Sequence, residues 1–150
     1  MLKEGDKAPN FKGIDQNNEP IELSNFSKKK LILYFYPKDD TPGCTKEACN
    51  LRDNYDALSK DNFAVVGVSA DTSAKHTKFI SKYNLPFSLL ADTEKEVIKS
   101  YNCWGLKKFM GREYEGILRK TFVIENNTII KIFEKVKTTD HFNQIIEALN

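Results

Sequence analysis

Two cysteines, Cys44 and Cys49, lie five residues apart in the segment PKDDTPGCTKEAC, which directly follows the apolar run 31–36. As a thiolate, a cysteine can attack an electrophile or bind a metal ion, so the pair is open to two kinds of chemistry. The element that carries each cysteine, and the residues around it, decide between these uses.

Cys44 is predicted to lie in the first turn of a helix. Thr41 suits the N-cap position and Pro42 the first helical position, where its missing N–H is no loss. The unpaired N–H groups and the dipole of a helix start favour a thiolate there, so we predict a nucleophile. The alternative is a small buried hydrophobic residue, because Cys44 shares an apolar stripe with Ala48 and Leu51.

Cys49 lies too far along the same helix to bond to Cys44 while the helix is intact. Their spacing corresponds to ~7.5 Å of rise and ~140° of rotation, which puts the two Cα atoms roughly 8 to 9 Å apart. A disulfide needs Cα atoms within ~7 Å of each other. A reaction between the two thiols therefore requires the first turns to unwind, which Gly43 would make easier. Otherwise Cys49 is an inert residue on the helix flank.

Other uses of the pair fit the spacing poorly. Glu47 occupies the place of the second cysteine in a C-x-x-C motif, and Arg52 that of the third cysteine in a plant-type iron–sulfur pattern. Zinc would need further ligands, and Cys103, His76 and His141 show no paired spacing. We predict no metal or other cofactor, and no role for either histidine.

The two cysteines belong to a predicted βαβ unit. The runs 31–36 and 63–68 are continuously apolar, as in strands covered on both faces, and the apolar helical stripe runs between them from Cys44 to Leu58. Such a unit has parallel strands and a right-handed crossover. Cys44 then lies at the carboxyl end of the first strand, where open α/β sheets place their sites.

The remaining elements complete a thioredoxin-like α/β fold with a central mixed sheet flanked by helices. Runs 121–124 and 128–133 flank Glu125-Asn126-Asn127 and predict an antiparallel hairpin. A further small hairpin is predicted near the amino terminus, turning at residues 15–19. Three more helices are predicted from their caps, at Thr72 or Ser73, at the Thr93-x-x-Glu96 capping box, and at Thr139 or Asp140. The order βαβ followed by ββα indicates the fold.

The composition predicts one soluble domain spanning residues 1–150. Hydrophobic residues make up 40% of the 150 positions, and no apolar stretch approaches the ~20 residues of a membrane span. The amino terminus lacks the apolar core of a signal peptide, which predicts a cytoplasmic protein with reduced thiols. A net charge of +2, spread along the chain, gives no reason to expect nucleic acid or a membrane as a partner.

The spacing Pro37-x-x-x-Thr41-x-x-Cys44 resembles the active-site motif of the peroxiredoxins, and the step to Cys49 resembles the peroxiredoxin Q / bacterioferritin comigratory protein subfamily. Further motifs like those of the subfamily follow in order over nearly the whole chain: Lys7-Ala8-Pro9-x-Phe11, Gly67-Val68-Ser69-x-Asp71, Leu85-Pro86-Phe87-x-Leu89-Leu90-x-Asp92, Trp104-Gly105-x-Lys107-Lys108-Phe109-Met110-Gly111 and Arg119-x-Thr121-Phe122-Val123-Ile124. The resemblance implies a peroxidase of antioxidant defence that reduces hydrogen peroxide and alkyl hydroperoxides.

The resemblance also implies roles for individual residues. Cys44 would be the peroxidatic cysteine, whose thiolate attacks the peroxide and becomes a sulfenic acid. Thr41 would hold the peroxide oxygen, in competition with its capping role, and Pro37 would shield the sulfur. Arg119 would stabilise the thiolate and the leaving oxygen, although its sequence context alone indicates a solvated side chain.

The same resemblance makes Cys49 the resolving cysteine, which would form a redox-active disulfide with Cys44 that thioredoxin or a thioredoxin-like protein reduces. Glu47 would support the site, or would be only a favourable acid near a helix start. Cys103 matches no catalytic position and is most simply a packed residue, with a secondary reactive thiol as the alternative. The chain would be a monomer or a dimer.

A different class of function uses the same two cysteines. The disulfide between Cys44 and Cys49 could act as the switch of a thiol-based redox sensor or chaperone instead of a catalytic intermediate. The sequence offers no separate segment for binding a partner protein, so the peroxidase is the favoured hypothesis.

Overall fold

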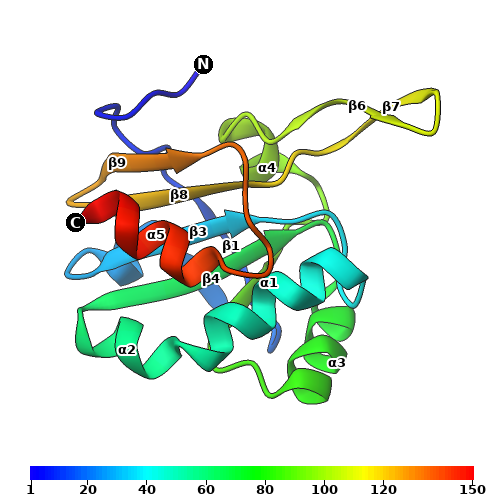
Figure 1. The fold of residues 1–150 in the computed structure, drawn as a ribbon. Helices are drawn as coiled ribbons and strands as arrows, with labels where there is room; N and C mark the ends of the chain where they lie inside the picture. Colours follow the sequence, from blue (N-terminus) through cyan, green and yellow to red (C-terminus); the bar gives the residue numbers. More distant parts are fainter.

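A computed structural model describes all 150 residues and arranges them around a five-stranded mixed sheet with strand order β5-β4-β3-β8-β9 (Figure 1). The strands are β3 (Lys30–Phe35), β4 (Phe63–Ser69), β5 (Ser88–Ala91), β8 (Lys120–Glu125) and β9 (Thr128–Phe133). β3, β4 and β5 are parallel, whereas β8 runs antiparallel to both β3 and β9. The predicted thioredoxin-like α/β fold with a central mixed sheet is confirmed.

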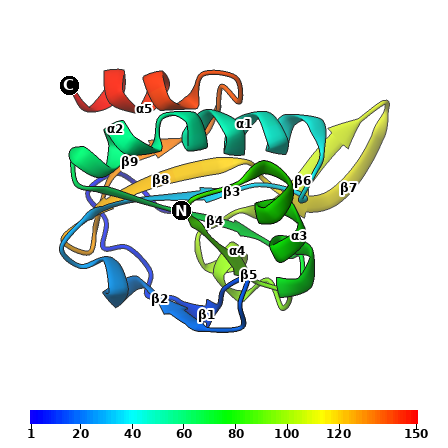
Figure 2. The ribbon, with the colours of Figure 1, turned by 90° about the horizontal axis from the view of Figure 1, so that it is seen from below.

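Helices and a hairpin cover the two faces of the sheet (Figure 2). The elements outside the sheet are β1 (Lys12–Ile14), β2 (Pro20–Glu22), the 3-10 turn η1 (Leu23–Phe26), α1 (Pro42–Asp53), α2 (Tyr55–Lys60), α3 (Ser73–Tyr83), α4 (Glu96–Ser100), β6 (Trp104–Phe109), β7 (Arg112–Ile117) and α5 (His141–Leu149). Helices α1, α2 and α5 lie on one face, and α4 lies on the other with the β1–β2 hairpin. None of the helices has the length and apolarity needed to cross a bilayer.

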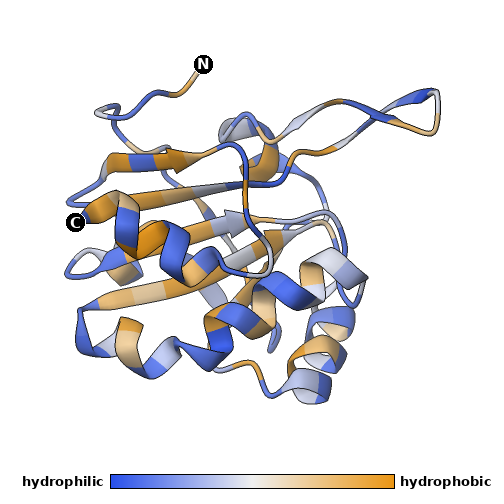
Figure 3. Cartoon of the chain, viewed as in Figure 1, coloured by the Kyte–Doolittle hydropathy of each residue, from blue (hydrophilic) through white to orange (hydrophobic).

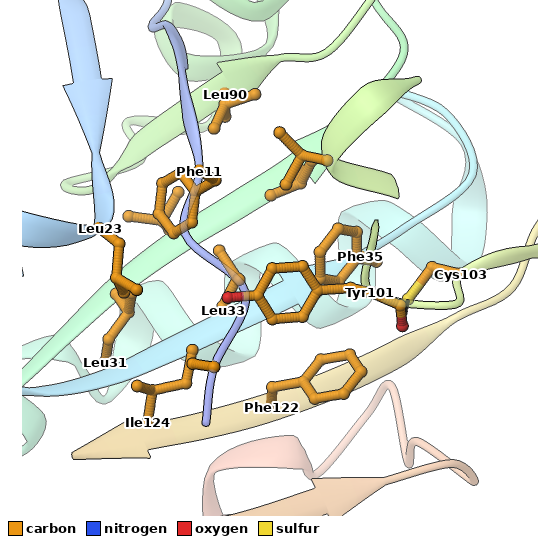
Figure 4. Packing of buried hydrophobic residues seen from close by; sticks show 14 of the residues in the cluster. Phe11, Leu23, Leu31, Leu33, Phe35, Leu90, Tyr101, Cys103, Phe122 and Ile124 are labelled. Atoms are coloured by element: carbon orange, nitrogen blue, oxygen red, sulfur yellow. Dashed lines mark hydrogen bonds between the residues drawn. The ribbon is translucent and has the colours of Figure 1, made fainter. Parts of the chain in front are cut away.

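Strand β3 separates two apolar clusters because its side chains alternate between the faces. Leu31, Leu33 and Phe35 belong to the cluster under α4 and the amino-terminal segment, which Figure 4 shows. Ile32 and Tyr34 belong to the cluster under α1, α2 and α5. A strand buried on both faces explains the continuous apolar run in the sequence.

Both predicted hairpins are present. β1 and β2 pair antiparallel across a turn at residues 15–19. β8 and β9 turn at Asn126 and Asn127, whose φ angles of 53° and 61° are left-handed, a conformation that asparagine tolerates. Thr72 caps α3 through a hydrogen bond from the Lys75 N–H to its hydroxyl, which confirms that helix start.

The capping box predicted for α4 does not form, whereas the predicted start of α5 is confirmed at Asp140. α4 begins only at Glu96, after Lys95 adopts a left-handed φ of 62°, and its first turn donates to Asp92 Oδ2 from the Ile98 N–H over 2.8 Å. The Thr93-x-x-Glu96 pattern therefore does not form a capping box. Asp140 occupies the N-cap position of α5 without a capping hydrogen bond from its side chain. The predicted helix along the apolar stripe is also divided at Asn54 into α1 and α2.

The antiparallel hairpin β6–β7 was not predicted and extends away from the body of the protein (Figure 1). Its strands carry a mixture of polar and apolar residues (Figure 3), and Phe109 and Met110 at its tip are 65% and 87% exposed. Only its base, at Trp104 and Ile117, packs on an apolar cluster, so the rest of its sequence lacks the alternation that marks a strand with one buried face. The short strand β5 was also missed.

Candidate active site

Cys44 lies in the first turn of α1, where the sequence places it. The chain leaves β3 and forms a loop over residues 36–41. Thr41 then takes the N-cap position with extended backbone angles, and Pro42 opens the helix. Thr41 does not cap the helix through its side chain, because its hydroxyl donates to the Lys38 carbonyl oxygen over 2.8 Å. The Cys44 side chain is buried, with only 2% of the residue exposed.

Arg119 joins this first turn from the link between β7 and β8. Its Nη2 donates to Cys44 Sγ over 3.3 Å, and its Nη1 donates to Glu47 Oε1 over 2.7 Å. The side chain is 22% exposed, so the expectation of a solvated arginine, drawn from its sequence context alone, is wrong. A cation in direct contact with sulfur stabilises the thiolate.

Gly43 leaves the room that Arg119 occupies. A Cβ atom at position 43 would have Arg119 Nη2 as its neighbour at 3.3 Å, which is a crowded contact. The missing side chain therefore allows the guanidinium to approach the helix start. Pro37 is half-buried at the beginning of the loop.

Glu47 lies one turn after Cys44 and is completely buried. Burial raises the pKa of its carboxyl group to about 7, and the charge of Arg119 opposes this rise. Its Oε1 accepts the hydrogen bond from Arg119, whereas its Oε2 has no hydrogen-bond partner. The carboxylate is thus held by Arg119 on one side only.

His141, the first residue of α5, faces the other side of that carboxylate. Its Nε2 lies 3.7 Å from Glu47 Oε2 and 2.8 Å from the Thr121 hydroxyl, and the ring is fully buried. Burial lowers the pKa of His141 to about 4, so the ring is neutral at pH 7. The sequence alone gave this residue no role because the contact joins the last helix to α1, and no local pattern reports it.

The second histidine, His76, anchors the loop that precedes Cys44. Its Nδ1 lies 2.7 Å from Asp39 Oδ2, and its Nε2 lies 3.0 Å from the Leu90 carbonyl oxygen. Asp39 also accepts a hydrogen bond from the Tyr36 hydroxyl, and its N–H donates to Asp71. This network holds the loop against the ends of β4 and β5.

Asp39, Asp71 and His76 are also the residues whose spacing could suit a metal ion, because their donor atoms lie within 4.8 Å of one another. Asp71 Oδ2 accepts from the Asp39 N–H and from the Ser69 hydroxyl, and both nitrogens of His76 face acceptors. These hydrogen bonds give the cluster a structural explanation as the loop anchor.

The three cysteines are free thiols in different surroundings. Cys44 and Cys49 both belong to the continuous helix α1, in which Cys49 is half-buried and burial raises its pKa. Cys103 is fully buried beside Tyr101 (Figure 4), and its Sγ lies 3.5 Å from the Tyr101 carbonyl oxygen. Burial raises the pKa of Cys103 to about 12, which agrees with the prediction of a packed residue.

Related proteins match this chain over nearly its whole length. A family model described as "AhpC/TSA family" matches residues 4–133. Peroxiredoxin Bcp of Bacillus subtilis is 43% identical over 146 residues, which cover 97% of this chain and 93% of the relative. Peroxiredoxin Bcp of Escherichia coli is 42% identical over 149 residues, which cover 99% and 96%.

Solved structures agree with these relatives. Peroxidoxin BcpB from Mycobacterium tuberculosis has a TM-score of 0.87 and 28% identity, over 99% of this chain and 97% of that one. A peroxiredoxin Q structure from Xanthomonas campestris has a TM-score of 0.86 and 27% identity, over 93% and 89%. At this coverage, the similarity extends over nearly all of the fold that positions Cys44.

Proposed function

The chain belongs to the AhpC/TSA family and is a thiol peroxidase of the peroxiredoxin type, and from this premise we propose that Cys44 is its peroxidatic cysteine and Cys49 its resolving cysteine. The observation that carries the proposal is the 3.3 Å contact between Arg119 Nη2 and Cys44 Sγ. Among the three cysteines, Cys44 alone combines a helix start with a cation at the sulfur, two features that favour a thiolate.

In the first step, the Cys44 thiolate attacks the terminal oxygen of the peroxide. The S–O bond forms as the O–O bond breaks, Cys44 becomes a sulfenic acid, and the departing oxygen takes up a proton to leave as water or an alcohol. Arg119 stabilises the thiolate and then the negative charge that develops on the leaving oxygen. Thr41 would turn its hydroxyl from the Lys38 carbonyl toward the peroxide, and Pro37 would shield the sulfur.

In the second step, the Cys49 thiolate attacks the sulfur of the Cys44 sulfenic acid, the S–S bond forms as the S–O bond breaks, and the departing hydroxide takes up a proton and leaves as water. The intact α1 keeps the two Cα atoms roughly 8 to 9 Å apart, so its first turns must unwind before this step. Glu47 lies between the two cysteines in sequence, so unwinding also withdraws its carboxylate from Arg119. A thioredoxin or thioredoxin-like protein would then reduce the disulfide by thiol–disulfide exchange.

The substrates we propose are hydrogen peroxide and alkyl hydroperoxides, reduced in the cytoplasm by a single-domain protein that is a monomer or a dimer. A steady-state assay with each peroxide, with thioredoxin supplied or omitted, tests the proposal. We expect peroxide consumption that depends on thioredoxin and on Cys44. Oxidation of one equivalent without recycling would instead favour a redox switch.

A further inference from the structure

The buried carboxylate of Glu47 has two unlike neighbours. Arg119 donates to Oε1 over 2.7 Å, whereas Oε2 has no hydrogen bond and lies 3.7 Å from Nε2 of the equally buried His141. Only one other buried side-chain polar atom, the Tyr34 hydroxyl, lacks a partner. An unpaired buried oxygen is rare because it costs free energy, so its position beside a histidine needs an explanation.

The hydrogen bonds of Gln144 determine which nitrogen of His141 carries the proton. The Gln144 amide group donates to the Lys135 carbonyl over 2.7 Å, and its Oε1 accepts from the Lys137 N–H over 3.0 Å. The same Oε1 lies 2.8 Å from His141 Nδ1, which must therefore be the protonated nitrogen. In the neutral ring, Nε2 then has only a lone pair and accepts from the Thr121 hydroxyl.

A lone pair on His141 Nε2 disfavours a negative charge on Glu47 Oε2 and favours a proton there. Burial acts in the same direction, because it raises the pKa of Glu47 to about 7 and lowers the pKa of His141 to about 4. At moderately acid pH, the proton at the contact between Oε2 and Nε2 thus resides on Glu47, and His141 keeps only its Nδ1 proton.

The charge state of Glu47 matters for Cys44. When Glu47 is protonated, the positive charge of Arg119 acts fully on the sulfur, and when Glu47 is ionised it neutralises part of that charge. The other titratable groups that face this cluster are Tyr34 of β3 and Lys107 of β6, which interact electrostatically with Cys44 and Arg119.

We propose that His141 is a positioning residue of the peroxidase, which acts through Glu47: by presenting a lone pair to Oε2, it keeps the carboxyl group protonated and leaves the Arg119 charge free to stabilise the Cys44 thiolate. The proposal rests on the roles proposed above for Cys44 and Arg119. It gives α5, which contributes no reacting atom, a defined influence on the nucleophile.

The first test replaces His141 with an amide that can donate to Glu47. In His141→Gln, the amide N–H of the new side chain can donate to Glu47 and stabilise its ionised carboxylate. The pH midpoint for oxidation of Cys44 by hydrogen peroxide should then rise by about one unit, so that the rate below the midpoint falls about tenfold. The rate is measured in a single turnover by stopped flow. In a Glu47→Gln background, where residue 47 cannot ionise, the same substitution should change the rate less than about twofold.

The matched control is the other fully buried histidine. His76 contacts Asp39 rather than Glu47, so any effect of His76→Gln should be equally large in the wild-type and Glu47→Gln backgrounds. An effect of His141→Gln that persists undiminished in the Glu47→Gln background would overturn the proposal, because His141 would then act through packing alone. If Cys44→Ser retains turnover, the assignment of Cys44 fails instead, and the two failures are distinguishable.

A second measurement does not depend on the folding of a His141 variant. Because the pKa of His141 is lowered to about 4 in the native state, this residue makes the free energy of unfolding rise with pH between about 4 and 6.5. Because the pKa of Glu47 is raised to about 7, that residue makes the same free energy fall with pH between about 4.5 and 7. These slopes oppose each other in the wild type. Glu47→Gln should therefore show a steeper rise of unfolding free energy between pH 4.5 and 6.5, and an unchanged slope would contradict a protonated Glu47.

Discussion

Cys44 and Cys103 are both buried thiols, with 2% and 0% of each residue exposed, yet their surroundings predict opposite chemistry. Cys44 receives a hydrogen bond from the Arg119 guanidinium at the start of a helix. Cys103 lies in the apolar cluster beside Tyr101 and receives no hydrogen bond from a cation, and the charge of Lys120 only partly offsets the rise of its pKa through burial. Burial alone penalises a thiolate, and only at Cys44 do a guanidinium at the sulfur and a helix start oppose that penalty, which is why we propose Cys44 as the nucleophile.

Replacing each thiol by a hydroxyl should separate the two sites most strongly. Cys44→Ser removes the proposed nucleophile and should lower peroxidase turnover by about 10⁴-fold or more, as for other covalent catalysts. Cys103→Ser is the matched control and should leave turnover unchanged. Steady-state peroxide consumption with thioredoxin measures both, and substantial turnover in Cys44→Ser would remove the basis of the comparison.

Removing the cation should make Cys44 resemble Cys103. Arg119→Ala leaves the sulfur buried without its charged donor, and the rate of Cys44 oxidation should fall by about 10² to 10³-fold. The exposed Arg112 at the tip of the β6–β7 hairpin provides the control, because Arg112→Ala keeps the contact at Cys44 intact. Equal rates for the two variants would show that the guanidinium is not needed.

Cys49 tests whether the reactive thiol depends on a second thiol in its own helix. In Cys49→Ser, the first oxidation of Cys44 should proceed within about twofold of the wild-type rate, since the Arg119 contact remains. Turnover supported by thioredoxin should fall by about tenfold or more, because no intramolecular disulfide can form. Single-turnover and steady-state rates report the two effects separately, and unchanged turnover would mean that another thiol resolves the sulfenic acid.

The smallest expected effect on the rate of Cys44 oxidation comes from filling the space beside Cys44. In Gly43→Ala, the added methyl group would lie 3.3 Å from the present position of Arg119 Nη2. Because the guanidinium is the end of a flexible side chain, it should shift rather than unfold the site, and Cys44 oxidation should slow by roughly threefold. A rate equal to that of the wild type would show that Arg119 has more freedom than the structure indicates.

Local sequence patterns predicted the elements that bury a continuous face. The strand before Cys44, the start of α1 and the β8–β9 hairpin each have a signal within a few residues: an apolar run, a Thr-Pro pair and two asparagines in a tight turn. The position of Cys44 at a helix start followed from the same signals. The β6–β7 hairpin lacked such a signal because most of its residues beyond the base are exposed.

The residues around Cys44 were harder to predict because they come from separate elements. Arg119 resembled a solvated residue in its local context, and His76 and His141 matched no motif. Their partners lie far away in the sequence, so burial and contact arise only when the sheet and helices pack. The resemblance to a known family supplied Arg119, but nothing in the sequence indicated that a neutral histidine faces Glu47.

The most direct test of the contrast between the two buried thiols uses the Cys49→Ser variant. The protein is treated with one equivalent of hydrogen peroxide in the presence of a sulfenic-acid trap, and the modified residues are identified by mass spectrometry. We expect the trap on Cys44 and none on Cys103, because burial raises the pKa of the Cys103 thiol far above neutral pH. Modification of Cys103 at a comparable rate, or no modification of Cys44, would contradict the account.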